Sequence, residues 1–183
     1  MEYIKSRFYE NASKCIVEYN KLKKDYADVE IGKITIGQVM TGMKGMPALV
    51  TDTSNLDANE GIRFRGHSIP ELRQKLPRLS PEGEPLPEGL FYLMLVGDIP
   101  EMEDVMNLSK DWATRSHVPQ HVFDVIDAMP KSAKPMTIFS AAITAMATES
   151  VFQKAYRSGV NKKFYWDFMY DDVMNLISRL PRI

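Results

Sequence analysis

Hydrophobic residues recur every three or four positions through the first 29 residues, which is the period of an amphipathic helix. The positions that share this stripe are Ile4, Phe8, Ala12, Cys15, Tyr19, Leu22 and Tyr26. Polar and charged residues occupy the positions between them. The pattern therefore predicts one long helix over residues 1–29.

After Gly32 the helical period gives way to short alternating stretches and closely spaced glycines. Ile34 and Ile36 alternate with polar residues, and Met46–Thr51 and Ile62–Arg65 are two further extended candidates. The polar residues 51–61 are rich in turn formers and predict a loop between those two candidates. We therefore expect a small β element near residues 32–66.

Prolines and glycines divide the rest of the chain, residues 68–181, into helices. We expect helices at residues 70–76, 88–96, from 100 onward, between Pro119 and Pro130, at 135–158 and at 164–180. No repeat, low-complexity tract or linker interrupts this series. The sequence predicts a mainly α protein with a small β element.

Composition narrows the function classes. The 183 residues include 23 basic and 24 acidic ones, a net charge of −1, so the chain lacks the basic excess of a nucleic-acid binder. The single cysteine, Cys15, cannot form an internal disulfide. The longest apolar run, Leu90–Val96, is far too short to cross a membrane. The N-terminus shows no signal peptide, so we expect a cytoplasmic protein, of bacterial source.

Common catalytic motifs for nucleotide binding, hydrolysis and zinc binding do not occur in the sequence. His117 and His121 have a spacing that could present two metal ligands, but Pro119 between them favours an ordinary helix entry. Asp171 and Asp172 point about 100° apart on a helix, so their carboxylates do not converge as an acid–base pair. We interpret them as part of a solvent-exposed helix face. We assign no metal ligand and no catalytic residue.

Two lysines are candidates for binding a phosphate. Lys44 lies between Gly42 and Gly45, where the backbone can approach a ligand closely. Lys162 follows Asn161, a good N-cap residue, beside the start of a predicted helix whose dipole favours anions. The alternative for both is an ordinary solvated lysine. The residues alone indicate no reaction.

An ordered series of short segments nevertheless resembles the N-terminal part of citrate synthase. The resemblance is closest to the form typical of mitochondria and also found in some bacteria. It covers most of the chain from about Gly32. The segments that carry it are ITIGQVMTGMKGM (34–46), LDANEGIRFRG (56–66), SIPE (68–71), EPLPEGLF (84–91), PQHV (119–122), SAAITA (140–145), AY (155–156), YW (165–166) and LP (180–181).

This resemblance implies a multi-helical segment, residues 1–183, of the large helical domain of a homodimeric acyltransferase. The family condenses acetyl-CoA with oxaloacetate to give citrate and CoA, the entry step of the tricarboxylic acid cycle. It uses CoA as part of a substrate and no permanent cofactor. Its catalytic residues lie in a later portion, so the resemblance implies that this chain alone lacks them and is inactive.

Lys44 and Lys162 match two family positions where arginines approach the phosphates of CoA, so the resemblance implies CoA binding by both. Lysine keeps the charge and loses the bidentate geometry of arginine. Two alternatives to a citrate synthase segment stay open. One is a non-catalytic helical interaction or regulatory module, and the other is a segment of a related 2-methylcitrate synthase that acts on propionyl-CoA.

Overall fold

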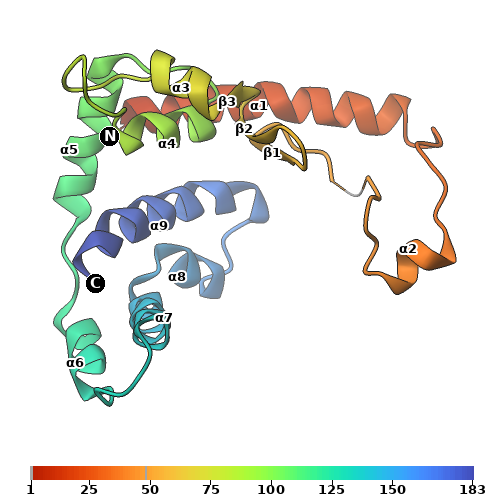
Figure 1. Cartoon of the computed structure of the whole chain (residues 1–183). Helices are drawn as coiled ribbons and strands as arrows, with labels where there is room; N and C mark the ends of the chain where they lie inside the picture. The colour runs from red at the N-terminus through yellow and green to blue at the C-terminus, as the bar shows by residue number, and fades with distance from the viewer. Residues whose placement is uncertain (1, 48) are drawn as a thin grey trace. The chain divides into compact units, whose positions relative to one another are not determined.

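The computed structural model describes residues 2–47 and 49–183, and helices make up most of both parts (Figure 1). The chain divides at Val105 into two compact units, which we call the first unit (residues 1–105) and the second unit (residues 106–183). The mainly α class with a small β element, predicted from the sequence, is confirmed.

The first unit combines helices with one small sheet. Its elements are α1 (Glu2–Asp25), α2 (Ile36–Met40), β1 (Ser54–Asp57), β2 (Gly61–Phe64), β3 (His67–Ser68), α3 (Ile69–Lys75) and α4 (Pro87–Val96). Helix α1 packs on α4, and α3 packs on the sheet (Figure 1). The predicted first helix is present as α1 but ends at Asp25, so the prediction is wrong for residues 26–29, and Met1 lies outside the described residues.

The three strands form an antiparallel sheet in the order β1-β2-β3, with Leu56 opposite Ile62. Asp57 makes the β1–β2 turn, because its Oδ1 accepts hydrogen bonds from the backbone N–H groups of Asn59 (2.8 Å) and Glu60 (2.9 Å). These bonds hold the pKa of Asp57 below its ordinary value. The turn is therefore shorter than the predicted loop 51–61, which contains β1.

The prediction of a strand at Ile34 and Ile36 is wrong, because α2 begins at Ile36 and Ile34, just before it, belongs to no strand. Thr35 and Gln38 make a capping box: the Thr35 hydroxyl accepts from the Gln38 N–H (3.2 Å), and the Gln38 Oε1 accepts from the Thr35 N–H (3.0 Å). These local bonds outweigh the alternating pattern. The described residues of Met46–Thr51 form no strand, and Ala48 in that stretch lies outside the described residues.

A cluster of leucines forms a core in the first unit. Leu72, Leu76 and Leu93 are buried, and Phe64, Leu90 and Ile99 pack against them. Helix α4 ends at Gly97, which has a φ of 103° and so adopts a left-handed conformation that suits glycine. The predicted end of this helix is confirmed.

The second unit is helical throughout its regular structure. Helix α5 (Met102–Arg115) leads into it, followed by α6 (Gln120–Ala128), α7 (Pro135–Met146), α8 (Val151–Arg157) and α9 (Tyr165–Arg179). Three 3-10 helices are interspersed: Ala147–Glu149, Lys162–Phe164 and Leu180–Arg182. Helix α6 packs on α7, and α8 packs on α9 (Figure 1). Val118, Val122, Ala142 and Met146 form its buried cluster.

The prediction of one helix over residues 135–158 is wrong, because the chain breaks between α7 and α8. Ser150 is the N-cap of α8, and its hydroxyl accepts a hydrogen bond from the Gln153 N–H at 2.9 Å. A capping serine favours a new helix start over continuation of the old one. The helical spacing of apolar residues continues across the break, so the sequence pattern does not indicate it.

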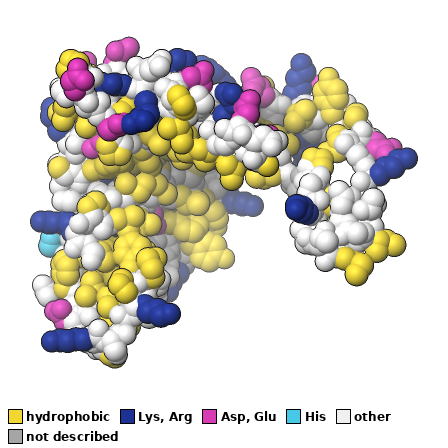
Figure 2. Space-filling view, viewed as in Figure 1, with side chains coloured by type: hydrophobic (Ala, Val, Ile, Leu, Met, Phe, Trp, Pro, Cys, Tyr) yellow, Lys and Arg dark blue, Asp and Glu magenta, His cyan; other side chains and the backbone are white. Residues whose placement is uncertain are grey.

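Several large hydrophobic side chains lie at the surface of the first unit. Ile36 is 81% exposed, Met40 82% and Leu49 80%. Figure 2 shows hydrophobic side chains on the surface of the α2 segment. Among the described helices, none combines the length and the apolar character that crossing a membrane requires.

Candidate functional site

Lys44 lies in a tight turn that follows α2. Gly42, Met43 and Gly45 all have positive φ angles, 74°, 63° and 73°. A Cβ atom at either glycine would meet nothing within 4 Å. Glycine is therefore favoured at these positions by the positive φ angles and not by a close neighbour. The side chain of Lys44 is exposed. Within the described parts of the chain it has no ion-pair partner.

Lys162 lies in the turn between α8 and α9, in the second unit. Gly159, with a φ of 77°, ends α8, and the Asn161 Oδ1 accepts a hydrogen bond from the Lys163 N–H at 3.1 Å. The Lys162 side chain is exposed and makes no ion pair with any residue that the structure describes. Lys44 and Lys162 therefore each offer a single accessible positive charge, one in each unit.

The helix start beside Lys162 differs from the prediction. Asn161 caps the three-residue 3-10 helix Lys162–Phe164, whereas α9 begins at Tyr165 and has Phe164 as its N-cap, without a side-chain bond. A single short turn gives little of the dipole that a long helix provides. Charge and exposure, more than a helix dipole, are what Lys162 offers an anion.

Lys163 is not equivalent to its neighbour. Its Nζ lies 4.7 Å from the centroid of the Phe164 ring, a cation–π distance. This contact turns the Lys163 side chain toward a protein group. Both lysine side chains are exposed, and among the described residues only Lys163 of the two makes such a ring contact.

The α8–α9 pair that carries Lys162 is joined by a carboxylate that the sequence interpretation placed on a solvated face. The Asp172 carboxylate accepts three hydrogen bonds from the start of α8: Ser150 Oγ (2.6 Å), Val151 N (2.8 Å) and Phe152 N (3.1 Å). The solvated-face interpretation is therefore wrong for Asp172. Asp171 instead faces Arg115, at 3.4 Å from its Nη2.

Two of the three histidines, His67 and His121, make polar contacts within the protein. The His121 Nε2 lies 3.2 Å from both the Ala145 carbonyl oxygen and the Thr148 hydroxyl, which ties α6 to the end of α7. The His67 Nδ1 lies 3.3 Å from the Lys75 Nζ. Among the described residues, no three His, Cys, Asp or Glu side chains cluster as metal ligands would.

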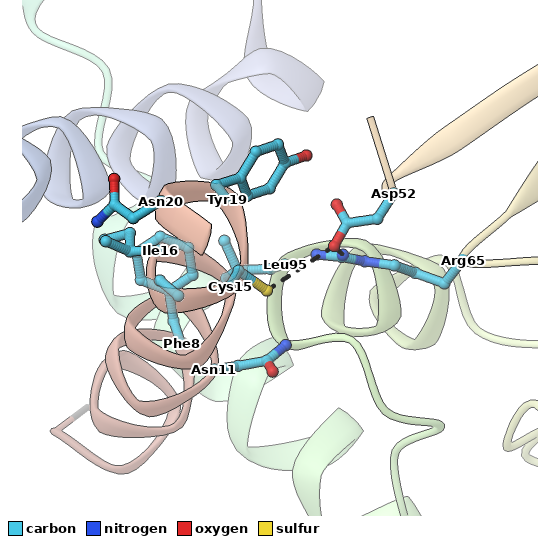
Figure 3. A pocket seen from close by; sticks show the side chains of 10 residues that line it. Phe8, Asn11, Cys15, Ile16, Tyr19, Asn20, Asp52, Arg65 and Leu95 are labelled. Carbon is cyan, nitrogen blue, oxygen red and sulfur yellow. Dashed lines mark hydrogen bonds and ion pairs between the residues drawn. The ribbon is translucent and has the colours of Figure 1, made fainter. Parts of the chain in front are cut away.

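A pocket of about 360 Å³ in the first unit escaped the sequence reasoning (Figure 3). Phe8, Ile16 and Leu95 give it apolar walls, while Arg65 and Asp52 lie at one side. Its lining combines α1 with residues far away in the sequence. No local pattern could have predicted it.

Arg65, Asp52 and Cys15 in this pocket contact one another. An Arg65 Nη1 to Asp52 Oδ2 distance of 2.9 Å marks an ion pair, and the Cys15 thiol donates to the same oxygen at 3.8 Å (Figure 3). Arg65 also donates to the Met94 carbonyl oxygen at 2.8 Å. Arg65 therefore has a structural role, because its guanidinium group pairs with Asp52 and holds the end of α4 through Met94.

Comparison with known proteins identifies the relatives of this chain. The family model described as "Citrate synthase, C-terminal domain" matches residues 42–183. The chain is 50% identical over 161 residues to the mitochondrial citrate synthase of Kajikia audax, which covers 88% of this chain and 34% of that protein. It is 44% identical over 180 residues to the mitochondrial citrate synthase of Saccharomyces cerevisiae, 98% of this chain and 38% of that protein.

A third relative is named for a different activity. The chain is 46% identical over 180 residues to the mitochondrial 2-methylcitrate synthase of Yarrowia lipolytica, covering 98% of this chain and 39% of that protein. The chain thus spans little more than a third of the length of these relatives. The expectation of a cytoplasmic protein from a bacterial source is wrong, because the names of these relatives are those of mitochondrial proteins.

Proposed function

The chain belongs to the citrate synthase family, and from that premise we propose that its full-length form condenses acetyl-CoA with oxaloacetate and water to give citrate and CoA. One observation carries the proposal. Identity of 44–50% extends over 88–98% of the chain but over only 34–39% of each relative. The family resemblance inferred from the sequence is confirmed, and the alternative of a non-catalytic regulatory module is not favoured.

The proposal includes the setting of the reaction. The full-length protein acts as an acyltransferase at the entry of the tricarboxylic acid cycle, with an acyl-CoA substrate and no resident cofactor. We propose that it is a homodimer and, in line with the names of its relatives, that it works in the mitochondrion. This chain is the part of the large helical domain that precedes the catalytic residues.

Within this function, Lys44 and Lys162 contact the phosphates of CoA. Both side chains are exposed, and neither has an ion-pair partner among the described residues. The glycine turn and the α8–α9 turn each hold one of them at an accessible position. An exposed ammonium group adds about 1 kcal/mol to the binding of a phosphate, which corresponds to about fivefold in affinity.

The test uses the full-length protein. In each of Lys44→Ala and Lys162→Ala, we expect the KM for acetyl-CoA to rise about fivefold, because one phosphate loses a charge partner. The increase is expected to shrink at high salt, since exposed charges are screened. Release of the CoA thiol in the presence of oxaloacetate measures the rate.

Lys163→Ala is the matched control, since this adjacent lysine lies over Phe164 and should leave the KM unchanged. Lys44→Arg and Lys162→Arg should retain or improve binding. An unchanged KM in both alanine variants refutes the phosphate assignment. The isolated 183-residue chain, measured beside the full-length protein, should release no thiol, and turnover by it refutes the assignment of catalysis to a later portion.

Similarity to a 2-methylcitrate synthase supports a second candidate function. That enzyme's identity to this chain, 46%, falls inside the 44–50% range of the citrate synthases. The two candidates differ in the acyl group, acetyl against propionyl. A comparison of kcat/KM for acetyl-CoA and propionyl-CoA in the full-length protein distinguishes them, and we expect acetyl-CoA to be preferred.

A further inference from the structure

Asp172 links the two helices of the α8–α9 hairpin at the end away from their connecting turn. This side chain lies in the middle of α9, and its carboxylate accepts from Ser150 Oγ, Val151 N and Phe152 N. Two of these donors are backbone N–H groups of the first turn of α8, which have no partner inside the helix. The carboxylate therefore fixes where α8 begins and which part of α9 it adjoins.

A cluster of aromatic rings holds the hairpin nearer its turn. The Phe152 and Tyr165 rings meet edge to face at a centroid distance of 5.1 Å, and Tyr156 lies 6.0 Å from Tyr165. Edge-to-face pairs at such distances are favourable. The Asp172 cap and the aromatic contacts thus hold α8 against α9. The short connection between the two helices, residues 158–164, carries Lys162.

The position of this connection depends on α8. The helix has seven residues, too few to be stable without tertiary contacts. Its last turn leads directly into Gly159, where the Gly159 N–H donates to the Tyr156 carbonyl oxygen (3.1 Å) and the Val160 N–H donates to that of Ala155 (3.2 Å). A shift of α8 along α9 would therefore shift the backbone that presents Lys162.

We infer that Asp172 is a positioning residue for Lys162, which it places by capping α8 and fixing the α8–α9 hairpin. This inference rests on the proposed function, in which Lys162 contacts a phosphate of CoA. Asp172 itself does not touch the substrate. Its effect is expected in the KM for the acyl-CoA and not in the chemical step.

The variant Asp172→Asn in the full-length protein tests the inference. The amide keeps one acceptor oxygen and loses the charge and the second acceptor, so the cap is weakened with little change of shape. We expect the KM for acetyl-CoA to rise about threefold, with kcat within twofold of the unmodified protein and an unchanged KM for oxaloacetate. Ser150→Ala, which removes one donor of the same cap, should give a smaller rise in the same direction.

A double-mutant cycle separates positioning from general destabilisation. In a Lys162→Ala background, Asp172→Asn should no longer change the KM for acetyl-CoA. Asp171→Asn, next to it on α9 but facing Arg115, is the matched control and should leave that KM unchanged. An unchanged KM in Asp172→Asn, or an equal rise with and without Lys162, overturns the inference. An unchanged KM in Lys162→Ala alone instead refutes the proposed phosphate contact on which the inference rests.

Discussion

Tyr92 is a nearly fully buried tyrosine in α4, with 1% of its surface exposed. Burial raises its pKa to about 12, because the phenolate would lose its hydration, and the nearby carboxylate of Asp104 adds to this effect. Tyr170 in α9 has a pKa raised to about 12 for the same principal reason. Both rings are thus neutral in the folded protein at a pH where an exposed tyrosine ionises.

This burial predicts a loss of stability at alkaline pH. Between pH 10 and pH 12 the unfolded chain releases phenolic protons that the folded chain retains, so the free energy of unfolding falls as the pH rises. The stabilising contribution of the two tyrosines is present in full below pH 10. Tyr92→Phe should make this fall less steep, because one of the two groups is removed. Urea unfolding at a series of pH values measures it. Identical slopes for the variant and the unmodified chain would contradict the prediction.

The candidate lysines show what sequence could establish at the scale of residues. Their sequence neighbours make Lys44 and Lys162 candidates, the family resemblance implies their role, and the structure describes both as exposed. The distinction between Lys162 and Lys163 required a ring contact, because the two are adjacent and chemically identical. The role of Asp172 was out of reach, since its partners at Ser150–Phe152 lie about 20 residues away in the sequence.

At the scale of elements, the end of α4 depends on Gly97. Its φ of 103° is unfavourable for any side chain, and a Cβ atom there would lie 2.5 Å from the Asn11 Nδ2. That amide group donates a hydrogen bond to the Val96 carbonyl oxygen, which links α1 to the end of α4. The glycine therefore serves both the turn and the contact between two helices.

Gly97→Ala should lower the free energy of unfolding by about 2 kcal/mol. Roughly half of this comes from the left-handed backbone and the rest from displacement of Asn11 and its hydrogen bond. Gly66→Ala is the control in the same unit, because Gly66 also has a positive φ, 82°, but open space around it. It should cost about 1 kcal/mol. Equal costs in urea denaturation would show that the Asn11 contact contributes nothing.

Most helix boundaries followed from local signals, and the errors have physical causes. Glycines and prolines marked the ends of α4 and α9, because they act through their own backbone. Helix α2 was mistaken for a strand, since a capping box of two residues outweighs a short alternation. The break between α7 and α8 was missed, because the apolar period continues across it while Asp172, distant in the sequence, holds the new start.

At the scale of the whole molecule, many large hydrophobic side chains of this chain are exposed and take no part in its core. On α1, Ile16 is 58% and Val17 68% exposed. The exposed fraction is 80% or more at Ile36, Met40 and Leu49. Contiguous exposed apolar surface commonly marks an interface. Under the proposed function, the remaining length of the full protein covers part of these faces, since this chain spans only 34–39% of its relatives.

The isolated 183-residue chain is therefore expected to associate in solution. Apolar faces that a larger protein would bury gain free energy by pairing with copies of themselves, at about 25 cal/mol per Å² removed from water. Sedimentation velocity at tens of micromolar, a concentration that populates contacts of micromolar affinity, should show species larger than the monomer. The double variant Ile36→Ser and Met40→Ser should reduce this association, because the two side chains are 81% and 82% exposed and make no part of the buried core. A monomer at every concentration would mean that these faces do not form an interface.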